Sequence, residues 1–217
     1  MKWIAARGIP RFLYASSQAV YGDAGGKALK EDHPCAPHSY YGVSKLAAEH
    51  YVNIFSRRGL STTIFRMSNV YGPGQNLDNL RQGMVSIYMA YLLRNDPILV
   101  MGSLERFRDL IYIDDVVDAW ATALDNSEAI GKTYNLASGL TTTVRELLDA
   151  EIIAFGHNPE TYEVICEGTT HGDIFGLRVD TSRVTDDLKW HPGVPVKEGI
   201  RRMSEWAKVL GNGKRHG

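Results

Sequence analysis

Tyr41 and Lys45 stand four residues apart in the segment 39–45, which reads Ser-Tyr-Tyr-Gly-Val-Ser-Lys. In an α-helix this spacing places a phenol and an ammonium group on one face. A fixed cation beside a phenol favours the phenolate, which can accept a proton from an alcohol near neutral pH. The same spacing also occurs on helices whose side chains only face solvent, so a structural role stays open at this point.

A second group of candidate residues follows a short apolar run, Arg11 to Ala15, which predicts a buried strand. Ser16 and Ser17 come directly after this run, so their hydroxyls are expected at the carboxyl end of a strand. Ligands bind at that edge in open α/β sheets. The alternative is that both serines only satisfy backbone groups at a turn.

The elements that must position these residues alternate along the chain, which predicts an α/β architecture. Ser39 is expected to cap the helix that carries Tyr41 and Lys45, and Asp114 or Asp115 to cap the helix Val116 to Leu124. The other expected helices are 84–93, 143–155 and 196–210, and the other expected strands are 61–67, 98–101, 109–113, 133–137 and 161–165. The pattern suggests the second half of a doubly wound sheet and a smaller lobe.

Composition limits the classes of function that are open to the chain. Its 217 residues, 44% of them hydrophobic, can form one domain or one and a half, and a net charge of −1 argues against a nucleic-acid partner. No apolar run reaches the ~18 residues of a membrane span. Cys35 and Cys166 lie far apart and the histidines lack ligand spacing, so we expect reduced thiols, a cytoplasmic protein and no metal site.

Five motifs in order carry a family resemblance. Their residues are 16–22, 41–45, 65–74, 108–116, and Gly172-Asp173 followed by Asp180, Leu188 and Trp190. Together they cover nearly the whole chain and resemble the extended short-chain dehydrogenase/reductase family, the NAD-dependent nucleotide-sugar epimerases and dehydratases. The resemblance implies a homodimer formed through the Tyr41 helix and its neighbour.

The fold that this resemblance implies is a partial doubly wound, Rossmann-like parallel sheet with a smaller C-terminal α/β substrate lobe. Residues 1–70 and about 110–137 would belong to the dinucleotide-binding domain, and residues 71–109 and 138–217 to the substrate-binding lobe. In the family a strand and a glycine-rich turn hold the pyrophosphate of the dinucleotide. No such turn precedes the Ser17 strand, so about three βαβ units of ~30 residues each are expected in front of Met1.

The resemblance also implies roles for the candidate catalytic residues. Tyr41 would take the proton from a sugar hydroxyl while hydride passes to NAD, and Ser17 would hydrogen-bond the same hydroxyl. Lys45 would hold the nicotinamide ribose and favour the phenolate of Tyr41. Ser16, Tyr41 and Lys45 are the expected cofactor-binding residues.

Two residues beside Ser17 separate the reactions within the family. The 4,6-dehydratases carry an acidic pair where this chain has Gln18 and Ala19, and neither of these side chains can shuttle a proton near neutral pH. The best fit is therefore the branch of the UDP-glucose 4-epimerases. A nucleotide-sugar 4-reductase or dehydratase, or a non-catalytic fragment that only binds a sugar nucleotide, remains the alternative.

Arg108 matches the family arginine that grips the nucleotide diphosphate, a task suited to a guanidinium fork. Its alternative is an ion pair with Asp109 or Asp114. Arg66, on the strand 61–67, is expected to face the core as a structural arginine.

Asn69 matches an asparagine that contacts the diphosphate or the sugar, although it could equally cap a turn. A second phosphate-binding arginine is common two residues before Gly172, where this chain has Thr170. Arg178 is the expected substitute. The substrate-binding set is therefore Ser17, Asn69, Arg108 and Arg178, and the expected substrate is a UDP-hexose.

Overall fold

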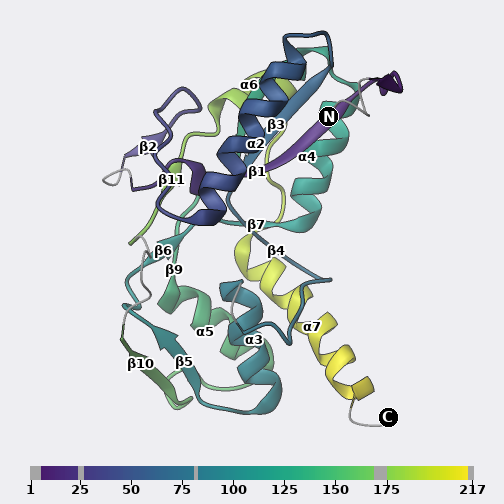
Figure 1. The fold of residues 1–217 in the computed structure, drawn as a ribbon. Helices are drawn as coiled ribbons and strands as arrows, with labels where there is room; N and C mark the ends of the chain where they lie inside the picture. The colour runs from purple at the N-terminus through teal and green to yellow at the C-terminus, as the bar shows by residue number, and fades with distance from the viewer. Residues whose placement is uncertain (1–5, 24–26, 81–82, 169–174, 215–217) are drawn as a thin grey trace.

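The computed structural model describes residues 6–23, 27–80, 83–168 and 175–214, which form two packed regions joined by extended segments (Figure 1). A parallel sheet in the order β1-β3-β8 forms the centre of the first region. β1 (Phe12–Ser17) pairs with β3 (Thr62–Met67), and β3 pairs with β8 (Lys132–Leu136). Because parallel strands end at a common edge, Ser17 comes to lie beside Met67 at the carboxyl edge of the sheet.

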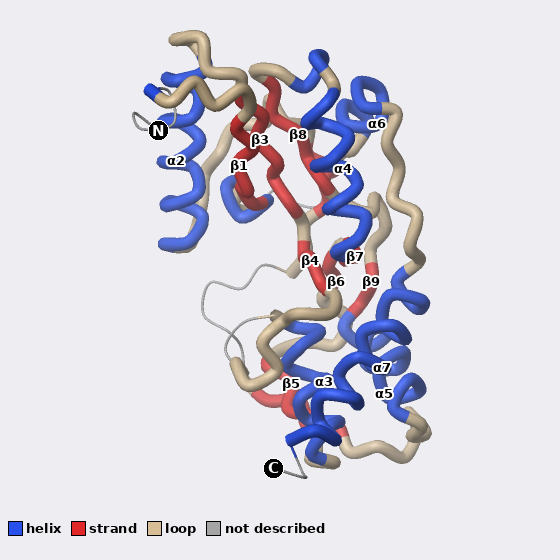
Figure 2. Tube along the Cα trace, turned by 90° about the vertical axis from the view of Figure 1, so that its right-hand side faces the viewer, coloured by secondary structure: helices blue, strands red, loops and turns tan. Residues whose placement is uncertain are grey.

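The first region has a helix on each side of this sheet. Figure 2 shows α2 (Tyr40–Ser56) and α4 (Ile113–Asp125) on opposite sides. Neighbouring residues of a strand point to opposite faces. Phe65 of β3 therefore stacks on Trp120 of α4 with ring centroids 5.7 Å apart, while Arg66 bonds to Glu49 of α2.

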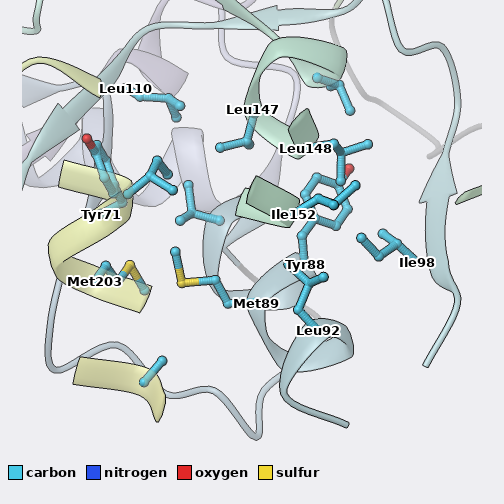
Figure 3. Packing of buried hydrophobic residues seen from close by; sticks show 14 of the residues in the cluster. Tyr71, Tyr88, Met89, Leu92, Ile98, Leu110, Leu147, Leu148, Ile152 and Met203 are labelled. Atoms are coloured by element: carbon cyan, nitrogen blue, oxygen red, sulfur yellow. The ribbon is translucent and has the colours of Figure 1, made fainter. Parts of the chain in front are cut away.

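The second region is built on β5 (Ile98–Met101) and β10 (Val164–Glu167), which pair in parallel. Three helices pack beside them, namely α3 (Met84–Arg94), α5 (Val144–Phe155) and α7 (Val196–Lys214). Figure 3 shows the side chains between these helices, among them Met89, Leu147, Ile152 and Met203, all of which are buried. This apolar cluster is separate from the one between the sheet and α4.

Short elements connect the two regions. β4 (Asn69–Tyr71) continues the chain from β3 and pairs in parallel with β7 (Leu110–Tyr112), which leads directly into α4. The remaining elements are β2 (Ala28–Leu29) with β11 (Arg178–Val179), β6 (Phe107–Arg108) with β9 (Thr142–Thr143), α6 (Ser182–Leu188), and the 3-10 helices η1 (Gln18–Val20) and η2 (Ser127–Ala129). The expected α/β class is confirmed, and the long elements lie where the sequence pattern predicts them.

The expected cap of α4 is wrong. The helix begins at Ile113, and its N-cap residue, Tyr112, makes no side-chain cap hydrogen bond. Asp114 and Asp115 therefore lie in the first turn, where a carboxylate is favoured by the helix dipole. The carboxylate of Asp115 instead accepts hydrogen bonds from the backbone N–H groups of Gly193 and Val194, at 2.8 and 3.1 Å.

The strand expected at 161–165 is displaced towards the C-terminus. Thr161 and Tyr162 donate backbone hydrogen bonds to the carbonyl of Asn158 and so form a turn. β10 begins only at Val164, in register with Ile98 of β5. The backbone N–H groups of Thr161 and Tyr162 donate within this turn, so they cannot donate to a neighbouring strand.

Glu151 lies in the core of the second region. Its side chain on α5 is fully buried, and neither carboxylate oxygen has a hydrogen-bond partner in the described part of the chain. Burial raises the pKa of Glu151 well above its ordinary value. The unfolded chain therefore releases this proton at a lower pH than the folded chain does, and folding stability falls as pH rises above about 4.5.

We expect Glu151→Gln to remove this loss of stability at higher pH. As pH rises above about 4.5, the melting temperature of the unaltered chain should fall relative to the variant by about 3–5 °C per pH unit until the folded chain ionises. Thermal unfolding across this pH range measures the difference, with Glu160→Gln at an exposed position as the control. Parallel pH profiles for the unaltered chain and Glu151→Gln would contradict the prediction.

Candidate active site

The two serines that follow the apolar run point in different directions at the end of β1. Ser17 is the N-cap of η1, and its Oγ accepts a hydrogen bond from the backbone N–H of Ala19 at 3.2 Å. Ser16 is buried, and its Oγ donates to Oε1 of Glu49 at 2.5 Å. The Ser17 hydroxyl therefore has no acceptor among the described residues and can donate at the edge of the sheet, while the hydrogen of Ser16 is directed towards α2.

The start of α2 lies against the segment that follows Ser17. As predicted, Ser39 caps the helix, with its Oγ accepting from the backbone N–H of Gly42 at 3.1 Å. A Cβ at Gly42 would lie 2.5 Å from the carbonyl oxygen of Ala19. Glycine therefore permits a close approach of the helix to η1, and this approach brings the neighbouring Tyr41 to the Ser17 end of β1.

Lys45 lies beside Tyr41 as the four-residue spacing predicts. Its Nζ is 5.5 Å from the ring centroid of Tyr41 and 5.5 Å from that of Tyr14. The same Nζ donates to the carbonyl oxygen of Ala15 on β1 at 2.7 Å. One of its three donors is used by this bond, and the other two have no hydrogen-bond partner among the described residues, so they can serve a ligand.

Ser16, Ser17, Tyr41 and Asn69 line one cavity of about 500 Å³. Tyr41 is 49% exposed there, and the cavity lies between the carboxyl edge of the sheet and the segment that leads into α3. The described lining residues are uncharged. Several amide and hydroxyl side chains that the sequence did not single out also line it, namely Ser68, Gln75, Asn76, Asn79 and Ser86.

Asn69 connects the cavity to the buried Asp109. The backbone N–H and the side-chain Nδ2 of Asn69 both donate to the carbonyl oxygen of Asp109, at 3.1 and 3.0 Å. The Asp109 carboxylate accepts from the backbone N–H groups of Ser138 and Gly139 and from the Ser138 hydroxyl, each at 2.8 Å. Asn69 therefore stabilises a junction of strands and lines the cavity as well.

Arg108 does not line this cavity but lies on β6. Its Nη1 donates to the carbonyl oxygens of Phe107 and Phe175, at 2.7 and 3.2 Å. Burial lowers the pKa of Arg108, and the nearby cation of Arg106 lowers it further. Arg106, which directly precedes β6, is a buried residue that the sequence did not single out.

Arg178 lies on β11 and is not among the residues that line the cavity either. Its guanidinium is 5.2 Å from the ring centroid of Phe107. Thr170, Gly172 and Asp173, which entered the expectation of a second phosphate-binding arginine, lie outside the described residues. Arg66 is a buried structural arginine, as predicted, and forms an ion pair with Glu49 at 2.7 Å.

Within the described ranges, no group of three or more His, Cys, Asp or Glu side chains could hold a metal ion. None of the helices in those ranges is long and apolar enough to cross a membrane.

Residues 1–137 match the protein-family model described as the NAD dependent epimerase/dehydratase family. This range contains Ser17, Tyr41, Lys45, Asn69 and Arg108.

Two curated relatives align with most of the chain. A putative UDP-glucose 4-epimerase of Methanocaldococcus jannaschii is 33% identical over 202 residues, which are 92% of this chain and 64% of the relative. A dTDP-4-dehydro-6-deoxyglucose reductase of Escherichia coli is 32% identical over 199 residues, which are 90% of this chain and 61% of the relative. The chain thus spans less than two thirds of the length of these relatives.

A solved structure of similar fold is the UDP-glucose 4-epimerase of Thermotoga maritima with UDP-glucose. It superimposes with a TM-score of 0.90 at 28% identity, covering 96% of this chain and 67% of that chain.

Proposed function

This chain belongs to the NAD-dependent epimerase/dehydratase family, and we propose that it provides the catalytic and sugar-binding part of a nucleotide-sugar 4-epimerase that acts on a UDP-hexose. The observation that carries this proposal is that Ser17 and Tyr41 line one cavity while Lys45, which is not among its lining residues, holds its charge 5.5 Å from the Tyr41 ring. Conversion of UDP-galactose to UDP-glucose by the whole epimerase of which this chain is proposed to be a part, supplied with NAD, is the test.

In this reaction Tyr41 Oη accepts the proton of the sugar 4-hydroxyl and later returns it. Ser17 Oγ lines the cavity with its hydrogen available and donates to the same sugar oxygen as charge develops there. Lys45, whose charge lies 5.5 Å from the Tyr41 ring, favours the phenolate. Bound NAD supplies the acceptor for the hydride from the sugar and its donor in the return step.

The residues present fit the nicotinamide end of NAD. The two remaining donors of Lys45 suit ribose hydroxyls, and Tyr41 offers its phenol on the same side of α2. The hydroxyl hydrogen of Ser16 is donated to Glu49, so Ser16 Oγ can contact the cofactor only as a hydrogen-bond acceptor. Residues 1–70 and about 110–137 would then form part of the dinucleotide-binding domain, and residues 71–109 and 138–217 the substrate-binding lobe.

The substrate is a neutral sugar joined to a nucleotide diphosphate. The uncharged lining of the cavity, including Asn69, suits a hexose. We assign the diphosphate to Arg108, because it stands at the arginine of the family motif and its guanidinium fork suits two parallel hydrogen bonds to phosphate oxygens. Arg178 would contact the substrate only if its guanidinium left the Phe107 ring.

A 4-reductase is the second candidate function, and the reductase relative from Escherichia coli supports it. Both reactions use the same proton-transferring group, but a reductase consumes one reduced cofactor per turnover whereas an epimerase consumes none. Elimination of water is disfavoured because Gln18 and Ala19, which form η1 after Ser17, have no titratable group. The free thiols of Cys35 and Cys166 suit a reducing, cytoplasmic compartment.

We further propose that the protein is a homodimer. α2 exposes large apolar side chains on its outer face, and these are Tyr40, Val43, Tyr51 and Ile54, each between 43% and 98% exposed. Their spacing of three, eight and three residues keeps them on one stripe of the helix. Such a stripe is suited to packing against the same helix of a second copy.

We expect Tyr51→Lys to shift the protein from dimer to monomer, because a charge would be placed in the apolar stripe. Light scattering after size exclusion measures the mass at fixed concentration. Val117→Lys, which changes an apolar residue on α4 that is 59% exposed, should leave the dimer intact. A monomeric unaltered chain, or an equal effect of both substitutions, would contradict the proposed interface.

A further inference from the structure

We propose that Glu49 is a positioning residue that sets the register of α2 on β1 and so holds the Tyr41 phenol beside the Ser17 hydroxyl. The proposal rests on the function assigned above to Tyr41. Glu49 does not line the cavity and touches no reacting group, so it would act through the placement of the helix.

The Glu49 carboxylate joins three elements in the interior of the first region. Only 2% of Glu49 is exposed. Its Oε1 accepts from Ser16 Oγ of β1 at 2.5 Å and from Arg66 Nε of β3 at 3.0 Å, and its Oε2 accepts from Arg66 Nη2 at 2.7 Å. Helix α2 is thereby tied to the strand that ends in Ser17 and to the strand beside it.

Arg66 is itself fixed on the other side. Its Nη1 donates to the carbonyl oxygen of Glu31 at 3.0 Å, and its guanidinium lies 4.9 Å from the ring centroid of Tyr21. A carboxylate bound by an immobile guanidinium has little freedom to follow a shifted helix. The ion pair therefore defines where Glu49 must lie.

Tyr41, Lys45 and Glu49 follow one another at intervals of four residues and so lie along one stripe of α2. Two of the three are bound to consecutive residues of β1, because Lys45 donates to the carbonyl of Ala15 and Glu49 accepts from Ser16. Gly42 packs against the carbonyl of Ala19 just beyond Ser17. These contacts fix both the sliding and the rotation of the helix relative to the strand.

Apolar contacts alone would not select this register with the same precision. A buried ion pair contributes little net stability, but its directional hydrogen bonds can specify one arrangement. Proton transfer requires this precision, since a displacement of about 1 Å can cost about 10²-fold in rate. The four-residue spacing thus links a base at one end of the helix to an anchor two turns away.

The test compares three variants of the whole chain. Ser16→Ala removes the tie to β1 and leaves the Glu49–Arg66 ion pair intact. Glu49→Gln removes the charge that holds Arg66. Val52→Ala trims a buried residue of the same helix and serves as the control for lost stability. Melting temperature is measured together with the NMR signal of the Tyr41 ring in protein labelled with ¹³C-tyrosine, which is assigned from its absence in Tyr41→Phe.

We expect the Tyr41 signal to move by more than its line width in Ser16→Ala and in Glu49→Gln, and to stay in place in Val52→Ala even where the melting temperature falls equally. If all three variants lose stability and none moves the signal, Glu49 is only a structural residue and the proposal is overturned. Should Glu49→Gln fail to fold, Ser16→Ala decides alone. The signal is independent of turnover, so normal activity of Tyr41→Phe would overturn the proposed function without deciding this result.

Discussion

Replacing Tyr41 by phenylalanine should lower turnover of a UDP-hexose by ~10² or more and leave the melting temperature almost unchanged. The substitution removes the proton-accepting oxygen but keeps the ring that lies 5.5 Å from Lys45 Nζ. The side chain is about half exposed, so few packing contacts depend on the hydroxyl. Turnover and thermal unfolding of the same preparation measure the two effects.

The neighbouring tyrosine provides a matched control for this substitution. Tyr40 is 98% exposed on the outer face of α2, so Tyr40→Phe should change neither quantity. Ser17→Ala should also slow turnover, with some loss of stability because Ser17 caps η1. Near-normal turnover in Tyr41→Phe would mean that the Tyr41–Lys45 pair has no catalytic role.

Replacing Arg108 by alanine should weaken the binding of UDP-glucose about thirtyfold. The loss of a charge-assisted, partly desolvated contact costs about 2 kcal/mol. The fold should persist, because Arg108 lies on the two-residue strand β6, outside the apolar clusters of both regions, where its Nη1 donates to the carbonyl oxygens of Phe107 and Phe175. Calorimetric titration with UDP-glucose measures the affinity.

Arg202→Ala is the control, since Arg202 forms its ion pairs on the outer face of α7 with Glu198 and Asp114. It should leave the affinity unchanged. An unchanged affinity in Arg108→Ala, accompanied by a large fall in melting temperature, would show that Arg108 stabilises the fold and does not hold the diphosphate.

The features that the sequence predicted well have local causes. Ser39 caps the helix of Tyr41 and Lys45 because a serine oxygen can accept from a backbone N–H within the first turn. The β-branched run of β3 and the apolar stripe of α5 likewise need no knowledge of distant residues.

The features that were missed depend on tertiary contacts. β2 and β11 are two-residue strands from distant parts of the chain, and so short a segment carries no periodic signal. Asp115 was expected to cap α4 because its type suits a cap, yet its partners Gly193 and Val194 lie almost eighty residues later. Similarly, the motif at 65–74 contains Arg66 but does not reveal its bond to Glu49.

The candidate site likewise contains residues that the sequence predicted and residues that it did not. The motifs predicted Ser17, Tyr41 and Asn69, and all three line one cavity. The sequence did not predict Gln75 and Asn79 as site residues. Their amides line the cavity because of the path that the chain takes after β4, which no local pattern indicates. Arg178 was selected by its closeness in sequence to a motif, whereas the cation that acts on Arg108 in the fold is that of Arg106.

Epimerase activity is measured by following UDP-galactose and UDP-glucose through the NMR signals of their anomeric protons, with NAD and the whole enzyme of which this chain is proposed to be a part. We predict that the two sugars interconvert without net consumption of cofactor, and that Tyr41→Phe lowers the rate by ~10² or more while Tyr40→Phe does not. Interconversion at the same rate in Tyr41→Phe, or binding of UDP-glucose at the cavity without any interconversion, would contradict it.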